Sequence, residues 1–298
     1  MNILKVTRPA DYSSYLGVTD PHPLISVIEY DRISPVPVTL NDYSVYGIFL
    51  RGDDLVDLTY GCGRYDYTAG TLLAVAPGQL GGTEDTGERI ALSGWAMLFH
   101  PDLLHGTSLE KTIGRYTFFD YRINEALHMT QEEKELIIGI MRSIETEVNK
   151  PHDTHQNAII VSYLELMLNF CQRFYDRQFL TRRPMSSDIL SQFHTILKDY
   201  FAKGEQHRHG LPNMQYFADR MRFSTSYLGD MIRRTTGTNA SKYIQRIVMQ
   251  EAKNQLASGK TVSETAYWLG FDYPQHFTRF FKREEGMTPT EYIRNRKS

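Results

Sequence analysis

The last third of the chain contains one helix–turn–helix pattern twice, and this repeat constrains the fold more than any other feature. In the later copy, Thr261 and Glu264 form a capping box at the start of a helix. Gly270 suits the end of that helix, and Pro274 suits the first turn of the next one. The earlier copy starts at Asn213, 48 residues before Thr261. A repeat with such a period indicates that one supersecondary unit is used twice.

The second helix of the later copy separates apolar from basic side chains. Phe277, Phe280 and Phe281 recur at helical spacing, so they predict a buried stripe rather than a surface on which bases stack. Two short helices, a tight turn and a basic second helix are typical of a helix-turn-helix whose second helix enters the major groove of DNA. The basic face carries Thr278, Arg279, Lys282 and Arg283.

A continuous helical pattern over residues 239–258 joins the two copies. A helix of these 20 residues spans about 30 Å at a rise of about 1.5 Å per residue. This length is close to the roughly 34 Å between major-groove faces one turn apart. The sequence therefore predicts that one chain reads two adjacent segments of double-stranded DNA without dimerising.

The segment GFDYPQHFTRFFKREEGMTPTEY at 270–292, together with the earlier copy, resembles the AraC/XylS family of bacterial transcription regulators. The resemblance covers roughly residues 188–298. It implies a C-terminal DNA-binding domain and, before it, a cupin-like sensor barrel with helices. The sequence departs from the family where Gly229-Asp230 replaces a frequent Ser-Arg pair, and where Ile293 rather than Arg follows the last Tyr.

Side chains near the exposed start of each recognition helix are expected to read bases, and cations further along are expected to hold phosphates. Arg279 suits a bidentate pair with guanine, and Gln275 suits one with adenine. For Lys282 and Arg283 the alternative is a solvated charged turn. The expected DNA contacts are Gln275, His276, Thr278, Arg279, Lys282 and Arg283 in the second unit, and Ser224, Thr225, Ser226, Tyr227, Arg233 and Arg234 in the first.

Asp230 is expected on the face of the first recognition helix that approaches DNA. A carboxylate there would either accept a hydrogen bond from a cytosine amine or indicate that this unit contributes position rather than base reading. We favour the second interpretation.

Charge is distributed unevenly along the chain. From Asp188 onward there are 17 Lys and Arg against 11 Asp and Glu, whereas the preceding part has 16 against 24, which gives the net charge of −2. Basic charge gathered in one segment is typical of phosphate binding. DNA is therefore expected to contact the C-terminal part, with RNA polymerase as a further candidate partner.

Enzymatic alternatives lack the residues that they need. A cupin-type enzyme requires a cluster of metal ligands, and a DNA-repair methyltransferase requires an activated thiolate, but neither Cys62 nor Cys171 has a helper motif beside it. Two cysteines also suggest neither a disulfide framework nor a zinc site. No catalytic residue and no cofactor are therefore expected. Without a signal peptide or an apolar run near 18 residues, the sequence predicts a cytoplasmic protein without membrane contact.

The first part of the chain reads as a polar, proline-rich arm and then short strands. The arm covers residues 1–23 and is expected to contain no helix. Gly-containing turns between short strands predict an antiparallel cupin-like barrel over about residues 10–115, and residues 65–78 resemble a cupin hairpin. The expected strands are 24–29, 43–51, 54–59, 71–76 and 91–99.

This barrel is expected to hold a small-molecule effector rather than a metal. His22, His100 and His105 are scattered, and His207 and His209 lie in a polar loop without a third ligand, so no metal is predicted. Barrel mouths bind ligands on apolar walls with a few polar groups. The alternative is control by a protein partner instead of an effector. The candidate effector residues are Tyr43, Tyr46, Phe49, Arg51, Trp95 and His22.

Helices are expected over about residues 124–180, including amphipathic patterns at 136–148 and 157–179. The 157–179 helix is apolar on more than one face, so it suits either a homodimer interface or an intramolecular core. The predicted plan is therefore α+β in two domains: a sensor and dimerisation domain at 1–180, a linker at 181–187, and an all-α DNA-binding domain at 188–298 with two helix-turn-helix units joined by a long helix.

Overall fold

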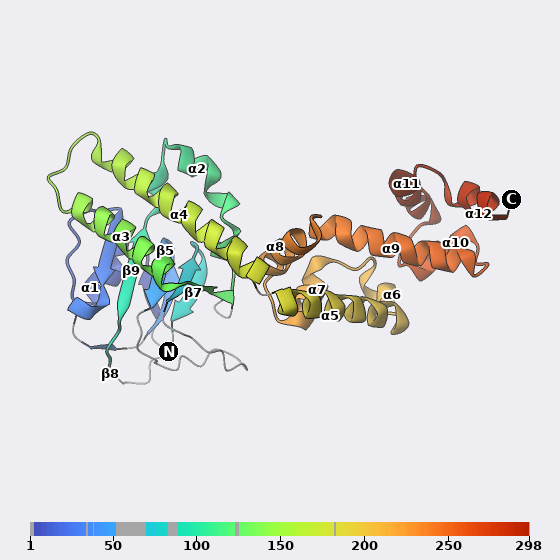
Figure 1. Cartoon of the computed structure of the whole chain (residues 1–298), viewed down its shortest axis with the longest axis horizontal. Helices are drawn as coiled ribbons and strands as arrows, with labels where there is room; N and C mark the ends of the chain where they lie inside the picture. Colours follow the sequence, from blue (N-terminus) through green and yellow to red (C-terminus); the bar gives the residue numbers. More distant parts are fainter. Residues whose placement is uncertain are drawn as a thin grey trace. The chain divides into compact units, whose positions relative to one another are not determined.

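The computed structural model describes residues 3–33, 35–37, 39–51, 70–82, 89–122, 125–181 and 183–297. The chain divides into two compact units, Met1–Gln178 and Phe179–Ser298. The first unit contains β-sheets followed by helices, and the second is helical (Figure 1). The expected α+β organisation in two parts is therefore present.

The strands of the first unit form three sheets. The largest has the order β10-β6-β5-β9-β2 and is antiparallel throughout. A second sheet has the order β1-β4-β7, in which β1 runs parallel to β4, and β3 pairs with β8. The strands are β1 (Ile3–Val6), β2 (Ile25–Glu29), β3 (Val36–Pro37), β4 (Leu40–Tyr43), β5 (Tyr46–Arg51), β6 (Thr71–Val75), β7 (Gln79–Gly82), β8 (Arg89–Ile90), β9 (Gly94–Phe99) and β10 (Leu127–His128).

The described strands do not close into the single barrel that the sequence predicts. β3, β8 and β10 are each two residues long, so they cannot carry hydrogen bonding continuously from one sheet to the next. The expected strand at 54–59, most of the expected hairpin at 65–78, and Cys62 lie outside the described residues. The other expected strands are present, but those expected at 43–51 and 91–99 each start three residues later, at Tyr46 and Gly94.

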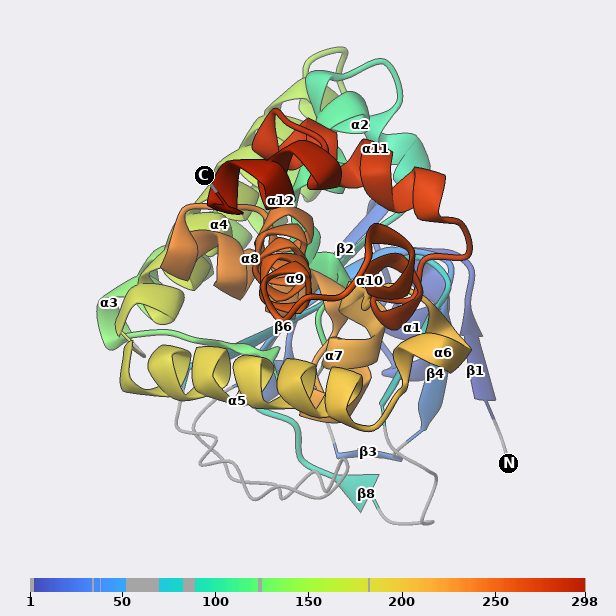
Figure 2. The same ribbon diagram turned by 90° about the vertical axis from the view of Figure 1, so that its right-hand side faces the viewer.

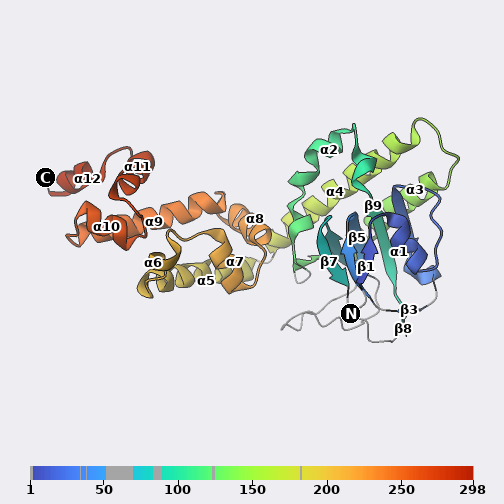
Figure 3. The same cartoon turned by 180° about the vertical axis from the view of Figure 1, so that it is seen from behind.

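Central strand β9 is buried at every position because both faces of its sheet are covered. Ala96 and Leu98 belong to a core cluster with Val6 and Tyr12, whereas Trp95 lies under the guanidinium of Arg142. Figures 1 and 3 show α3 and α4 on one side of this sheet and α1 on the other. These helices are α1 (Pro9–Tyr15), α3 (Gln131–Val148) and α4 (Gln156–Thr181); α2 (Ser108–Thr112) and the 3-10 turns η1 (Tyr30–Arg32), η2 (Pro101–Leu104), η3 (Ile113–Arg115) and η4 (Thr117–Asp120) complete the unit.

Helix α1 corrects the expectation that the first 23 residues contain no helix. Pro9 occupies the first turn, where its missing N–H costs no intrahelical hydrogen bond. The carboxylate of Asp11 accepts hydrogen bonds from the backbone N–H groups of Thr7 and Arg8, each at 2.8 Å. The arm is polar, but its proline and its aspartate are placed where a helix begins.

The second unit consists of helices, and the elements expected from the repeat are all present. They are α5 (Arg183–Ala202), α6 (Gln206–His209), α7 (Met214–Met221), α8 (Thr225–Thr236), α9 (Ala240–Ala257), α10 (Val262–Trp268), α11 (Pro274–Glu285) and α12 (Pro289–Lys297). Figure 1 shows α8 at one end of α9 and α10 and α11 at the other, and Figure 2 looks along α9.

Helix α5 begins at Arg183, within the segment 181–187 that the sequence predicts to be a linker. Pro184 is its second residue, and a proline in the first turn of a helix removes no intrahelical bond. Pro184, which interrupts the pattern in the predicted linker, therefore lies at the start of a helix. Likewise, the expected polar loop after α5 contains the single turn α6.

Candidate nucleic-acid interface

The second helix-turn-helix is fixed by a capping box at the start of α10 and by close backbone packing in the turn that follows α10. The backbone N–H and hydroxyl of Thr261 donate to the carboxylate of Glu264, both at 2.8 Å, and lower the pKa of that carboxylate. Gly270 follows α10 with a φ of +91°, and a Cβ at this position would lie 2.9 Å from the backbone of Gly210. Only glycine satisfies both the dihedral and the space.

Three buried phenylalanines hold α11 in place. Phe277, Phe280 and Phe281 are all buried, as the sequence predicts. The ring of Phe277 lies 5.5 Å from that of Phe271, and the ring of Phe281 lies 5.4 Å from that of Tyr292 on α12. This packing fixes which face of α11 remains exposed.

The exposed face of α11 contains five of the six expected DNA contacts: Gln275, His276, Arg279, Lys282 and Arg283. Thr278 is half-buried, and its hydroxyl donates to the carbonyl of Pro274 at 3.0 Å. The Nε of Arg283 donates to Glu284 at 2.8 Å, whereas Arg279 has no ion-pair partner among the described residues. Arg279 is thus an exposed cation in the middle of the helix, with its donors available to an anion or a base.

The first recognition helix, α8, differs from this arrangement. Ser224 is its N-cap: its hydroxyl accepts from the backbone N–H of Tyr227 at 3.1 Å, and its side chain is buried. Tyr227 is only 3% exposed and packs 5.2 Å from the ring of Phe223. The expectation that Tyr227 lies on the exposed helix start is wrong, because the aromatic ring fills the core of its own unit. Thr225 is exposed and Ser226 half-buried.

Asp230 does not lie on the exposed face of α8, contrary to the sequence-based expectation. It is 7% exposed, and its carboxylate accepts a hydrogen bond from the guanidinium of Arg233 at 2.7 Å. A buried carboxylate needs such a partner, and the i, i+3 spacing on a helix supplies one. The charge of the exposed Arg233 is therefore partly neutralised by a partner on the same helix, while Arg234 is half-buried.

Helix α9 connects the two copies physically. It packs against both α8 and α10, and its 18 residues correspond to a length of about 27 Å. At its far end, Lys253 forms an ion pair with Glu285 of α11 at 2.7 Å and lies over the ring of Tyr292. The relative placement of the two recognition helices thus depends on one continuous helix.

Arg222, Lys242 and Arg246 are among the exposed cations of this unit that were not singled out from the sequence. Arg222 ends α7 in the left-handed conformation, with a φ of +60°. Its position corresponds to Gly270 in the repeat, so the alignment of the two copies was the signal that could have identified it. Arg222 therefore lies in the turn that precedes Ser224, the N-cap of α8.

The expected effector residues in the first unit do not gather at one site. Tyr43 packs against Phe49 at 6.0 Å on one side of the large sheet. On the other side, Tyr46 stacks on Phe99 at 5.1 Å, and Trp95 lies under Arg142. His22 bonds to Asn157 of α4, and Arg51 ends β5.

A cavity of about 680 Å³ in the first unit has a charged lining instead. It is lined in part by Glu29, Arg32 and Glu145, and by none of the six expected effector residues. Arg32 donates to Glu145 at 2.9 Å and also pairs with Glu29.

Two of the chemistries considered for the sequence, metal binding and a reactive thiol, concern residues whose surroundings the structure describes in part. No group of three His, Cys, Asp or Glu among them is arranged to hold a metal ion. Cys171 is buried, and burial raises the pKa of its thiol to about 12. Within the same residues, no helix is long and apolar enough to cross a bilayer.

Comparison with known proteins places the repeat in a family. A family model described as a helix-turn-helix domain matches residues 217–295. The uncharacterised transcriptional regulatory protein YesN of Bacillus subtilis is 35% identical over 91 residues, which cover 28% of this chain and 25% of YesN. The HTH-type transcriptional activator RhaS of Yersinia pestis is 32% identical over 75 residues, which cover 25% of this chain and 28% of RhaS. The chain thus spans about a quarter of the length of these curated relatives.

The crystal structure of ToxT from Vibrio cholerae aligns with 91% of this chain and 98% of its own, at 11% identity and a TM-score of 0.30. The assignment rests on the family model, which extends from α7 into α12 and includes both recognition helices. The expected resemblance is confirmed: the chain contains an AraC/XylS-type helix-turn-helix DNA-binding domain.

Proposed function

We propose that this protein is a transcription regulator that binds double-stranded DNA sequence-specifically and reads two adjacent major-groove segments with α8 and α11. The observation that supports this most is the exposed face of α11, where Gln275, His276 and Arg279 project from a helix anchored by three buried phenylalanines. A rigid helix with exposed polar side chains near its start suits base readout.

Within α11, the roles follow from position along the helix. Arg279 has donors suited to the N7 and O6 of guanine, and Gln275 suits the edge of adenine. Lys282 and Arg283 lie one turn further along and suit phosphates, which supply affinity without sequence information. His276 stands beside Tyr273, with ring centres 5.4 Å apart, and is exposed like its neighbour Gln275.

Helix α8 is proposed to position the protein on the DNA more than to read bases. Tyr227 and Asp230 are buried, so fewer side chains remain at its exposed start than in α11. Arg233 would have to exchange or share its Asp230 partner to hold a phosphate. Thr225 remains the exposed residue best placed at the start of the helix.

The first unit is proposed to provide the input, as a sensor for a small-molecule effector. Its charged cavity at Glu29, Arg32 and Glu145 is of a size that small ligands occupy, within about 300–1,000 Å³. An effector would shift the balance between two states only by binding them unequally. The alternative is control by a protein partner that docks on this unit.

A homodimer through α4 is the proposed assembly. Ile159 and Leu166 lie on the same face of α4, seven residues apart, and are 38% and 45% exposed. Exposed apolar side chains at this spacing suit contact with a second copy of the helix. RNA polymerase is a further proposed partner, and the cytoplasm is the proposed location of the protein.

Selection of preferred sequences from random duplex DNA with the full chain tests the function directly. Two enriched blocks about one helical turn apart would support reading by both helices. Enrichment of a single block that changes in Arg279→Ala would restrict base reading to α11. Failure to enrich any sequence, with and without metabolite extracts as an effector source, would overturn the proposal.

A further inference from the structure

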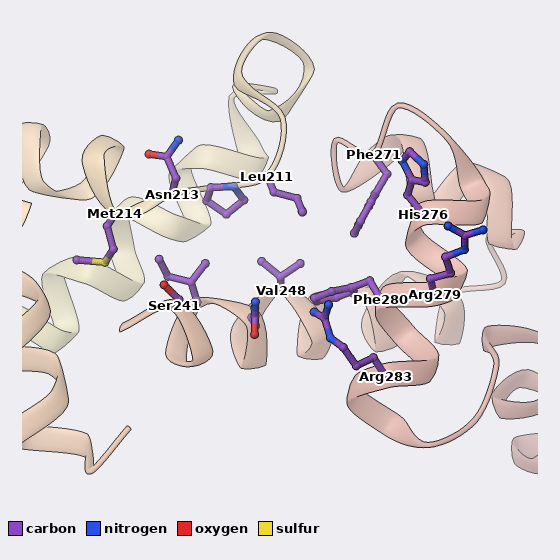
Figure 4. Close-up of a pocket in the computed structure, with 13 residues that line it drawn as sticks. Leu211, Asn213, Met214, Ser241, Val248, Phe271, His276, Arg279, Phe280 and Arg283 are labelled. Atoms are coloured by element: carbon purple, nitrogen blue, oxygen red, sulfur yellow. The ribbon is translucent and has the colours of Figure 1, made fainter. Parts of the chain in front are cut away.

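A cavity of about 610 Å³ lies inside the second unit, between the start of α7, the middle of α9 and the exposed face of α11. Its size falls within the range of about 300–1,000 Å³ in which proteins bind small molecules. Figure 4 shows Leu211, Val248 and Phe280 pointing into this space from three different segments. The two copies of the repeat therefore line an open hollow of their own, and none of its lining residues belongs to the first unit.

The walls of this cavity are predominantly apolar. Leu211 lies just before α7 and Met214 is its first residue, whereas Val248 lies on α9. Phe271 comes from the turn between α10 and α11, and Phe280 from α11 itself. An apolar wall of this kind favours a ring or an alkyl chain, because burying apolar surface is favourable at about 25 cal/mol per Å². It does not by itself select among apolar ligands.

The charged side chains of the lining favour anionic ligands. His276, Arg279 and Arg283 line the cavity, and none of its 13 lining residues is an aspartate or a glutamate. The guanidinium of Arg283 lies 5.5 Å from the ring centre of Phe280, at the boundary between charged and apolar lining. Its Nε is bonded to Glu284, which leaves its terminal amines as donors. A cationic group beside an apolar wall is complementary to an amphipathic anion.

We propose that this cavity binds a small amphipathic anion, namely a carboxylic acid with an apolar ring or chain. The carboxylate would accept hydrogen bonds from the terminal amines of Arg283, and the apolar body would lie against Phe280 and Val248. Arg279 and Arg283 are also the cations assigned to DNA. If the proposed function holds, the acid and DNA therefore compete, and the DNA-binding unit carries a regulatory site of its own.

The direct test is a titration of the full chain with 6-fluoro-2-naphthoate, followed by fluorine NMR. The neutral 6-fluoro-2-naphthamide is the matched ligand, with the same ring and no charge. A charge-assisted hydrogen bond supports a preference of about ten-fold or more for the acid. Equal affinity of the acid and the amide would overturn the proposal.

Variants locate the bound acid within the chain. Arg283→Gln should weaken binding about ten-fold, whereas Arg246→Gln, an exposed arginine of α9 outside the cavity lining, should leave it unchanged. Ser241→Trp places a large side chain at the rim from an exposed position and should block binding, and Gln245→Trp serves the same purpose if the first variant does not fold. Binding that survives both Arg283→Gln and a tryptophan variant lies elsewhere and refutes the site.

Competition is measured separately, as release of a selected duplex by the acid but not by the amide. Because the NMR titration contains no DNA, a failure of the DNA-binding proposal leaves the test of the cavity intact. Retention of the duplex by protein that is saturated with acid would refute the regulatory part of the inference.

Discussion

Gly270 offers the sharpest test of how the second helix-turn-helix is built. A Cβ added there would meet the carbonyl oxygen of Gln206 and the carbonyl carbon and oxygen of Gly210, all at 2.9 Å. These are backbone atoms, so relief requires movement of the chain after α5. The left-handed dihedral of an L-residue costs roughly 1–2 kcal/mol, and an overpacked contact costs roughly 1–3 kcal/mol. Gly270→Ala should therefore lower the free energy of opening of α10 and α11 by about 2–5 kcal/mol.

Gly286→Ala is the matched control, because Gly286 ends α11 with a φ of +76° and has nothing within 4 Å of an added Cβ. It should cost only the dihedral term of roughly 1–2 kcal/mol. Hydrogen exchange on peptides from α10 and α11 reports the local opening of both variants in the full chain. A loss for Gly270→Ala no larger than that for Gly286→Ala would refute the argument that the backbone of Gly210 occupies the space.

Three further predictions follow from the proposed roles. Arg279→Ala should cost about 1–3 kcal/mol on the preferred duplex and relax one base position; an equal loss on random DNA, measured by fluorescence anisotropy, would mean that Arg279 only holds phosphate. Asp230→Asn should release Arg233 and strengthen binding to every sequence by a few-fold with a steeper salt dependence, and a gain on one sequence alone would contradict this role. Phe281→Ala should destabilise the second unit by about 3–5 kcal/mol, seen as lost exchange protection in α11; unchanged protection would show that its ring does not anchor the helix.

The sequence by itself determined those features that depend on neighbours a few residues apart. The Thr261 and Glu264 capping box, the left-handed Gly270 and the buried Phe277, Phe280 and Phe281 all follow from spacing along one helix or one turn. The repeat then required a second unit of the same kind. Because such interactions are local, residue order alone specifies them, and the DNA-binding domain could be recognised without coordinates.

Only the tertiary structure decided which faces are covered. Tyr227 and Asp230 lie near an exposed helix start in sequence, but packing against Phe223 and pairing with Arg233 remove them from the surface. The aromatic residues of the first unit point to both sides of one sheet, and the strands form separate sheets instead of one barrel. The cavity between α7, α9 and α11 likewise exists only because segments far apart in the chain converge. Burial depends on contacts between distant segments, and the residue spacing that predicts a helix or a strand contains no information on which neighbour will cover it.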